Sequence, residues 1–144
     1  MTDDPFGNLR DWGPVLELLD ELASSGKLAE CQRGLVRILR YKGNWRLREE
    51  VLKQIGGIPS PSKELVGQTL AIFTDDNIYY DARILASDAL IQLLNNNQSS
   101  LHKEFIPEIR KVIEKLSKLP QPPIYDTAIK KLDSEISTQG VMKN

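Results

Sequence analysis

The feature that most constrains this chain is a pattern of residues that occurs twice, 35 positions apart. It consists of an arginine and three apolar residues at fixed spacing: Arg48, Val51, Ile55 and Ile58, then Arg83, Ala86, Leu90 and Leu93. A period of about 20–50 residues is typical of stacked helical repeats, in which each unit buries its apolar face against its neighbour. We therefore expect an all-α protein built from similar helix pairs.

Hydrophobic periodicity predicts where the helices lie, because apolar residues recur at three- and four-residue steps between polar or Gly/Pro breaks. It predicts seven helices: about 14–24, 27–41, 45–55, 63–74, 79–94, 101–119 and 124–136. Ser60 or Ser62 is expected to cap the fourth helix, and Phe6 or Trp12 to fold back on the core. We expect an irregular lead-in at 1–13, one helical domain at 14–138 and a flexible tail at 139–144.

The composition fits a folded domain, since 40% of the 144 residues are apolar and 27% are charged. The net charge of -1 argues against a dedicated nucleic-acid binder. No apolar run approaches the roughly 20 residues that span a bilayer, and the acidic N-terminus does not have the pattern of a signal peptide. With a single cysteine, Cys31, on an apolar helix stripe, we expect a soluble, cytoplasmic protein that does not bind membranes.

The two copies of the pattern, at 44–58 and 77–93, resemble HEAT repeats, a family that pairs two antiparallel helices per unit. In that family the second helix typically opens with an arginine, which an Asp or Asn precedes in the turn. The resemblance implies a short right-handed α-solenoid of about seven antiparallel helices; an irregular helical bundle is the alternative. It also implies that Arg48 and Arg83 are partly buried, and that Asp75, Asp76 or Asp81 accepts hydrogen bonds from them.

Charge is distributed unevenly along the chain. Residues 1–30 carry seven acidic and two basic side chains, a net charge of -5, whereas residues 31–54 carry seven basic and two acidic ones, a net charge of +5. Arg33, Arg37 and Arg40 are spaced so that they share one helix face, which we call the arginine face. This face could bind an acidic protein surface or the phosphates of a nucleic acid, or it could simply be a solvated face answered by the acidic first helix.

A second candidate surface combines aromatic side chains with arginine at the starts of two predicted helices: Trp45, Arg46, Tyr79 and Tyr80. In a HEAT-like stack these starts lie along one edge. Aromatic residues and arginine are enriched among the residues that dominate binding energy in protein interfaces. The alternative interpretation is that these rings only cover helix ends.

Catalytic, cofactor-binding and metal-ligating patterns are not found in the sequence. His102 is the only histidine, which leaves no second nitrogen ligand for zinc, and neither glycine-rich phosphate loop occurs. Our first hypothesis is a non-enzymatic protein–protein interaction module: an adaptor, a complex subunit or an immunity-type inhibitor. The alternative is nucleic-acid binding through the arginine face. An enzyme is a third hypothesis, because HEAT-like chains include phycobilin lyase relatives and a class of DNA glycosylases.

Overall fold

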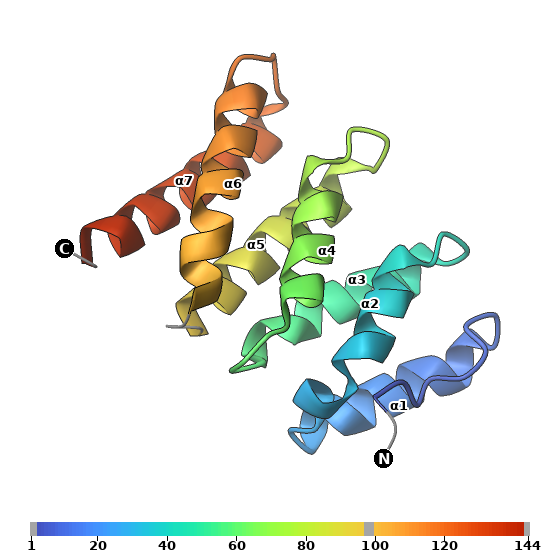
Figure 1. Cartoon of the computed structure of the whole chain (residues 1–144). Helices are drawn as coiled ribbons and strands as arrows, with labels where there is room; N and C mark the ends of the chain where they lie inside the picture. The colour runs from blue at the N-terminus through green and yellow to red at the C-terminus, as the bar shows by residue number, and fades with distance from the viewer. Residues whose placement is uncertain (1–2, 97–99, 143–144) are drawn as a thin grey trace.

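The fold is all-α, as the sequence predicted. Figure 1 shows the computed structural model, which describes residues 3–96 and 100–142. Within these residues there are seven α-helices, two short 3₁₀ helices and no β-strand. The α-helices are α1 Trp12–Ser24, α2 Gln32–Arg40, α3 Trp45–Gln54, α4 Lys63–Thr74, α5 Tyr80–Asn96, α6 Ser100–Ser117 and α7 Pro123–Met142; the 3₁₀ helices are η1 Leu28–Cys31 and η2 Ile55–Gly57.

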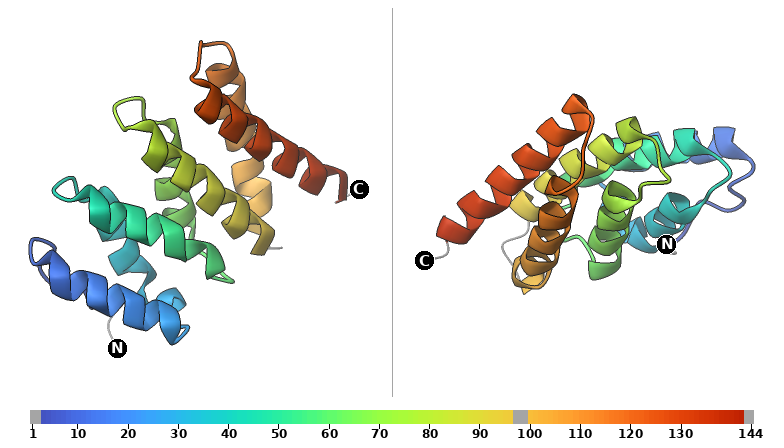
Figure 2. Two further views of the ribbon diagram at one scale, coloured as in Figure 1. Left: turned by 180° about the vertical axis from the view of Figure 1, so that it is seen from behind. Right: turned by 90° about the horizontal axis from the view of Figure 1, so that it is seen from above.

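The helices form two layers (Figures 1 and 2). Helices α1, α3, α5 and α7 lie side by side in one layer, and α2, α4 and α6 lie in the other; neighbours within each layer are in contact. The two layers also contact each other along the pairs α2–α3, α4–α5 and α6–α7. The core lies between the layers and includes large side chains with no exposed surface, such as Leu35, Phe73 and Leu90.

Polar side chains close the turns before α3, α4 and α5. Asn44 caps α3, because its side chain accepts a hydrogen bond from the Arg46 amide at 2.9 Å. Ser62 caps α4 in the same way, accepting from the Leu65 amide at 3.1 Å, which confirms the predicted cap. Before α5, the Asp75 carboxylate accepts from the Asn77 amide at 2.9 Å and closes the turn. Each bond satisfies an amide that would otherwise lack a partner.

Several predicted helix limits are wrong. α1 begins at Trp12 rather than Pro14, and α7 continues to Met142, beyond Ile136. The second predicted helix is divided into η1 and α2, since Leu28 and Cys31 are both buried and a three-residue turn places both on one side. Pro107 lies inside α6 rather than delaying its start. The proline removes one helix hydrogen bond, but the apolar stripe of α6 continues past it.

Residues 3–11, which we call the N-terminal strap, lie beside α2 at the open end of the α2–α4–α6 layer (Figures 1 and 2). Phe6 and Leu9 of the strap are buried in the core, so the expectation for Phe6 is confirmed. Trp12 instead remains 46% exposed. The strap therefore packs against α2, where the Phe6 ring lies on Gly34.

A buried arginine joins three helices. Arg83 of α5 is 2% exposed; its Nε donates to the Phe73 carbonyl at 3.1 Å and its Nη2 donates to the Tyr125 hydroxyl at 2.8 Å. The Tyr125 hydroxyl in turn donates to the Phe73 carbonyl at 2.6 Å. The Phe73 carbonyl belongs to the last turn of α4, where carbonyls lack helical partners and the helix dipole favours a cation.

The prediction that an aspartate accepts from Arg83 is therefore wrong. The guanidinium donates to a helix end and a tyrosine instead of to Asp75, Asp76 or Asp81. The burial of Arg48 and Arg83 near turns is confirmed, at 5% and 2% exposure. A main-chain carbonyl already held in place by α4 costs less side-chain ordering than a surface carboxylate would.

We expect Tyr125→Phe to lower the free energy of unfolding by about 1–3 kcal/mol, because it removes the buried acceptor of Arg83 Nη2 and one of the two hydrogen bonds that the Phe73 carbonyl accepts. The matched control is Tyr79→Phe, which removes the same hydroxyl from a 40% exposed ring. That change should shift stability by less than about 0.5 kcal/mol. Urea denaturation of the variants measures both effects. Equal losses in the two variants would contradict the role assigned to the buried bridge.

Candidate interaction surfaces

The starts of α1, α3, α5 and α7 lie along one edge of the molecule (Figure 2, left). The structure adds Trp12 and Ile124 to the residues that the sequence placed there. The resulting set, which we call the aromatic edge, is Trp12, Trp45, Arg46, Tyr79, Tyr80 and Ile124. Ile124 is 60% exposed and Tyr80 37%, so large apolar side chains reach solvent at the starts of α1, α5 and α7. Exposed aromatic and aliphatic side chains gathered in one place mark an interaction site more often than the same residues scattered singly.

Ring contacts join the edge from one helix to the next. The Arg46 guanidinium lies 5.8 Å from the centre of the Trp12 ring, which links α3 to α1. The Trp45 and Tyr79 rings meet edge to face at 5.1 Å, and the Tyr79 hydroxyl donates to the Glu49 carboxylate. These contacts hold the rings in fixed positions, so less side-chain entropy is lost when a partner binds them.

The two repeated arginines lie beneath these rings. Arg48 packs 4.2 Å from the centre of the Trp45 ring, and Arg83 packs 5.0 Å from Tyr80 and 4.2 Å from Tyr125. A guanidinium over an aromatic face is attracted by the ring quadrupole. The arginines of the sequence repeat are therefore buried beneath the rings of the aromatic edge and pack against them, rather than forming part of its surface.

Arg48 is less well satisfied than Arg83. Its Nε is buried and has no hydrogen-bond partner among the described residues. Burial lowers the pKa of Arg48, while the nearby charge of Asp75 acts in the opposite direction. Arg83, by contrast, donates to the Phe73 carbonyl and to the Tyr125 hydroxyl. The two copies of the repeated arginine therefore differ in their hydrogen bonds.

Exposed charges divide the aromatic edge into two parts. Lys42 and Arg46 are exposed near the start of α3, whereas Asp76 and Asp81 are exposed near the start of α5. The first part favours an acidic partner group and the second a basic one. A partner that crosses both parts would therefore meet charges of opposite sign in a fixed order.

The arginine face is not a free strip of positive charge. Arg37 donates to both carboxylate oxygens of Asp4, at 2.6 and 3.0 Å, and to the Gly7 carbonyl at 2.8 Å. This hydrogen bond from Arg37 is the main reason why the pKa of Asp4 lies below its ordinary value. Arg40 donates to the Gln68 side chain at 2.9 Å. Two of the three arginines are thus engaged within the chain.

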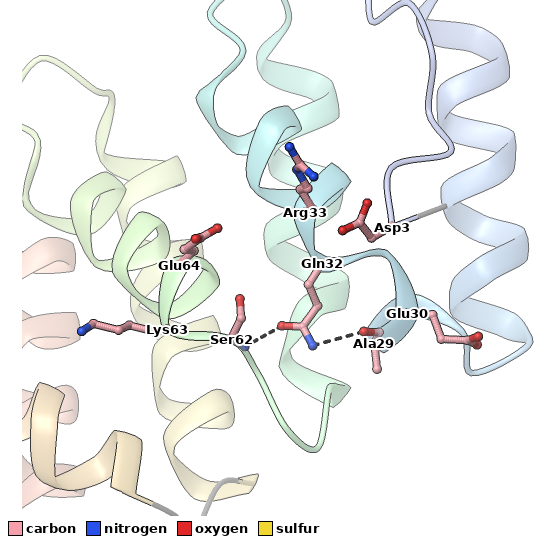
Figure 3. Close-up of a pocket in the computed structure, with 8 residues that line it drawn as sticks. All are labelled: Asp3, Ala29, Glu30, Gln32, Arg33, Ser62, Lys63 and Glu64. Atoms are coloured by element: carbon pink, nitrogen blue, oxygen red, sulfur yellow. Dashed lines mark hydrogen bonds between the residues drawn. The ribbon is translucent and has the colours of Figure 1, made fainter. Parts of the chain in front are cut away.

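Arg33 lies beside an open hollow of about 770 Å³ (Figure 3). The strap, η1, α2 and the start of α4 supply its lining: Asp3, Ala29, Glu30, Gln32, Arg33, Ser62, Lys63 and Glu64. Gln32 bridges the two sides, since it donates to the Ser60 carbonyl at 3.1 Å and accepts from the Ser62 amide at 2.5 Å. Lys63 is already paired with Glu104 at 2.5 Å. Charges of both signs line the hollow, so it does not select a polyanion.

The seven residues predicted to bind a partner separate into two surfaces. Trp45, Arg46, Tyr79 and Tyr80 come together on the aromatic edge, and the arginine face lies in the other layer, against the strap. Sequence reasoning missed Trp12 and Ile124 as edge residues. Each is the first or second residue of its helix, and that shared position is the signal that could have found them.

Comparisons with protein families, curated proteins and solved structures found no match to this chain. The resemblance to HEAT repeats therefore depends on the residues at 44–58 and 77–93. No group of three or more His, Cys, Asp or Glu side chains in the described part of the chain could hold a metal ion. The side chain of His102 lies outside the described residues. No described helix has the length and apolar character needed to cross a membrane.

The strap contacts produce a prediction at Gly34 of α2. A Cβ there would lie 2.6 Å from a Phe6 ring carbon and 2.8 Å from an Asp4 carboxylate oxygen. We expect Gly34→Ala to displace the strap, although alanine is about 1 kcal/mol better than glycine inside a helix. Hydrogen exchange of residues 3–11, followed by mass spectrometry, should show faster exchange in the variant.

Gly67→Ala in α4 is the matched control, because a Cβ there would meet only Phe105, at an ordinary 3.9 Å. This variant should be more stable than wild type by up to about 1 kcal/mol, and its strap should exchange at the wild-type rate. Unchanged strap exchange in Gly34→Ala would show that the close packing of Phe6 on α2 does not hold the strap.

Proposed function

We propose that this protein is a non-enzymatic protein–protein interaction module, a short HEAT-like α-solenoid that binds its partner through the aromatic edge. One observation carries the proposal: exposed rings and an exposed isoleucine lie at successive helix starts, and ring contacts and buried arginines hold the rings in place. Rigid aromatic side chains beside arginine are the composition that dominates binding energy in protein interfaces. In this account the chain acts as an adaptor, a complex subunit or an immunity-type inhibitor.

The order of charges on the edge supports a protein partner in particular. A protein segment can carry a basic group toward Asp76 and Asp81 and an acidic group toward Arg46. A nucleic acid carries one sign of charge throughout, and the acidic part of the edge would repel it. The two-layer packing, with each helix pair covering its neighbour, is the support for the solenoid part of the proposal.

Nucleic-acid binding through the arginine face remains the second candidate function. Arg33 and Arg40 are exposed on that face and support this alternative. The engagement of Arg37 by Asp4 counts against it, since a phosphate would have to displace a bidentate carboxylate. Binding of this kind would weaken steeply as the salt concentration rises, and Arg33→Glu with Arg40→Glu would abolish it.

Photo-crosslinking from the edge tests the first proposal. In one variant, expressed in native cells, the photoreactive residue p-benzoylphenylalanine replaces Tyr80. In a control variant it replaces Ala71, an exposed position of α4. We expect a discrete, nuclease-resistant protein adduct from position 80 and none from position 71. Ile124→Asp should reduce that adduct on the order of tenfold, the effect of losing an interface residue worth about 1.4 kcal/mol.

The substitution at Ile124 should leave the fold intact, because this side chain is exposed and surface changes usually shift stability by less than about 0.5 kcal/mol. Circular dichroism of the variant checks this. The proposal is wrong if position 80 yields no protein adduct, or if the adduct is unaffected by Ile124→Asp. Capture of nucleic acid alone would favour the second candidate.

A further inference from the structure

The N-terminal strap binds α2 as a short peptide binds a receptor. Residues 3–8 form neither a helix nor a strand, and the strap meets α2 through a few separate contacts. The Asp3 carbonyl accepts from the Gly34 amide at 2.9 Å, a group in the first turn of α2 that has no side-chain cap. The Asp4 carboxylate accepts two hydrogen bonds from the Arg37 guanidinium. A backbone contact, a charged fork and an apolar anchor are the elements of peptide recognition.

The apolar anchor is Phe6, for which α2 is specifically shaped. Its ring lies so close to Gly34 that any side chain larger than hydrogen would collide with it. Phe6 is 5% exposed, and Leu9, at the far end of the strap, is buried to the same degree. Gly7, at φ +68°, lets the strap turn between these two anchors, and its carbonyl accepts a further bond from Arg37.

The strap leaves two arginines of the arginine face without a carboxylate partner. Arg33 and Arg40 flank Arg37 on the same side of α2, and neither is paired with a carboxylate of the described residues. Open hollows lie at both ends of the strap: the one in Figure 3 beside Asp3, and one of about 390 Å³ beside Leu9 that Arg10, Arg37 and Arg40 line. Arg10 of the strap thus sits among arginines of its own charge. A segment with an acidic residue in its place would bind this face better.

We propose that this face of α2 is a docking groove for an extended acidic–aromatic segment of a partner protein, and that the strap is the internal ligand which such a segment displaces. The segment carries an acidic residue two positions before a phenylalanine and a second acidic residue four positions after it, where the strap has Arg10. Tethering gives the strap an effective concentration on the order of millimolar, so the groove stays closed until a stronger competitor arrives. The groove is separate from the aromatic edge and does not depend on the function proposed for it.

A peptide added in trans tests this inference on the full-length chain. The probe is a fluorescein-labelled peptide with the sequence of residues 3–11, followed by fluorescence anisotropy. Phe6→Ala in the protein weakens the strap and leaves the receptor face unchanged. The probe should bind this variant on the order of tenfold or more tightly than wild type, because the tethered competitor has lost its anchor. A probe carrying Phe6→Ala should not bind.

The double variant Phe6→Ala/Gly34→Ala is the control for the receptor face, and it should lose the probe altogether. If Phe6→Ala fails to fold, Asp4→Asn serves in its place, since it removes only a partly exposed ion pair. Absence of binding to a folded strap variant would overturn the inference and leave the strap as a permanent cap. So would binding that survives Gly34→Ala. Neither result would alter crosslinking from position 80, so the two proposals fail separately.

Discussion

The bond between Arg83 and the end of α4 decides how the starts of α5 and α7 are placed. The Arg83 guanidinium donates hydrogen bonds to the Phe73 carbonyl and the Tyr125 hydroxyl, and that hydroxyl donates to the same carbonyl. The network is closed and buried, which makes it costly to break in part. The tilted rings of Tyr80 and Tyr125, whose centres lie 5.1 Å apart, both pack against the Arg83 guanidinium. The exposed surface of the edge is thus determined by a polar group in the interior.

The two copies of the arginine show that one residue at matching positions of a sequence repeat can have different partners in the structure. Arg83 of α5 donates a hydrogen bond to the Tyr125 hydroxyl of α7. Arg48 relies on the Trp45 ring and leaves its Nε unpaired. At the N-terminal end, the strap packs against Gly34 of α2 through the Phe6 ring.

What the sequence could predict depended on whether the cause was local. Helix periodicity and the Ser62 cap arise from neighbouring residues, and both were predicted correctly. The partner of Arg83 could not be predicted, because Phe73 and Tyr125 reach it only through the packing of α4 and α7. The pairing of Arg37 with Asp4, 33 positions away, was missed for the same reason. The residues of the arginine face were identified from their spacing, but the engagement of Arg37 by the strap was not.

The most direct test of the account is an NMR titration of the protein, with labelled aromatic rings and isoleucine methyls, against the partner captured from position 80. The account predicts shift changes at Trp12, Trp45, Tyr79, Tyr80 and Ile124, with resonances of α6 unchanged. Shift changes confined to the labelled groups of α2 or α6 would contradict it, because the partner would then bind without the edge that the buried arginines support.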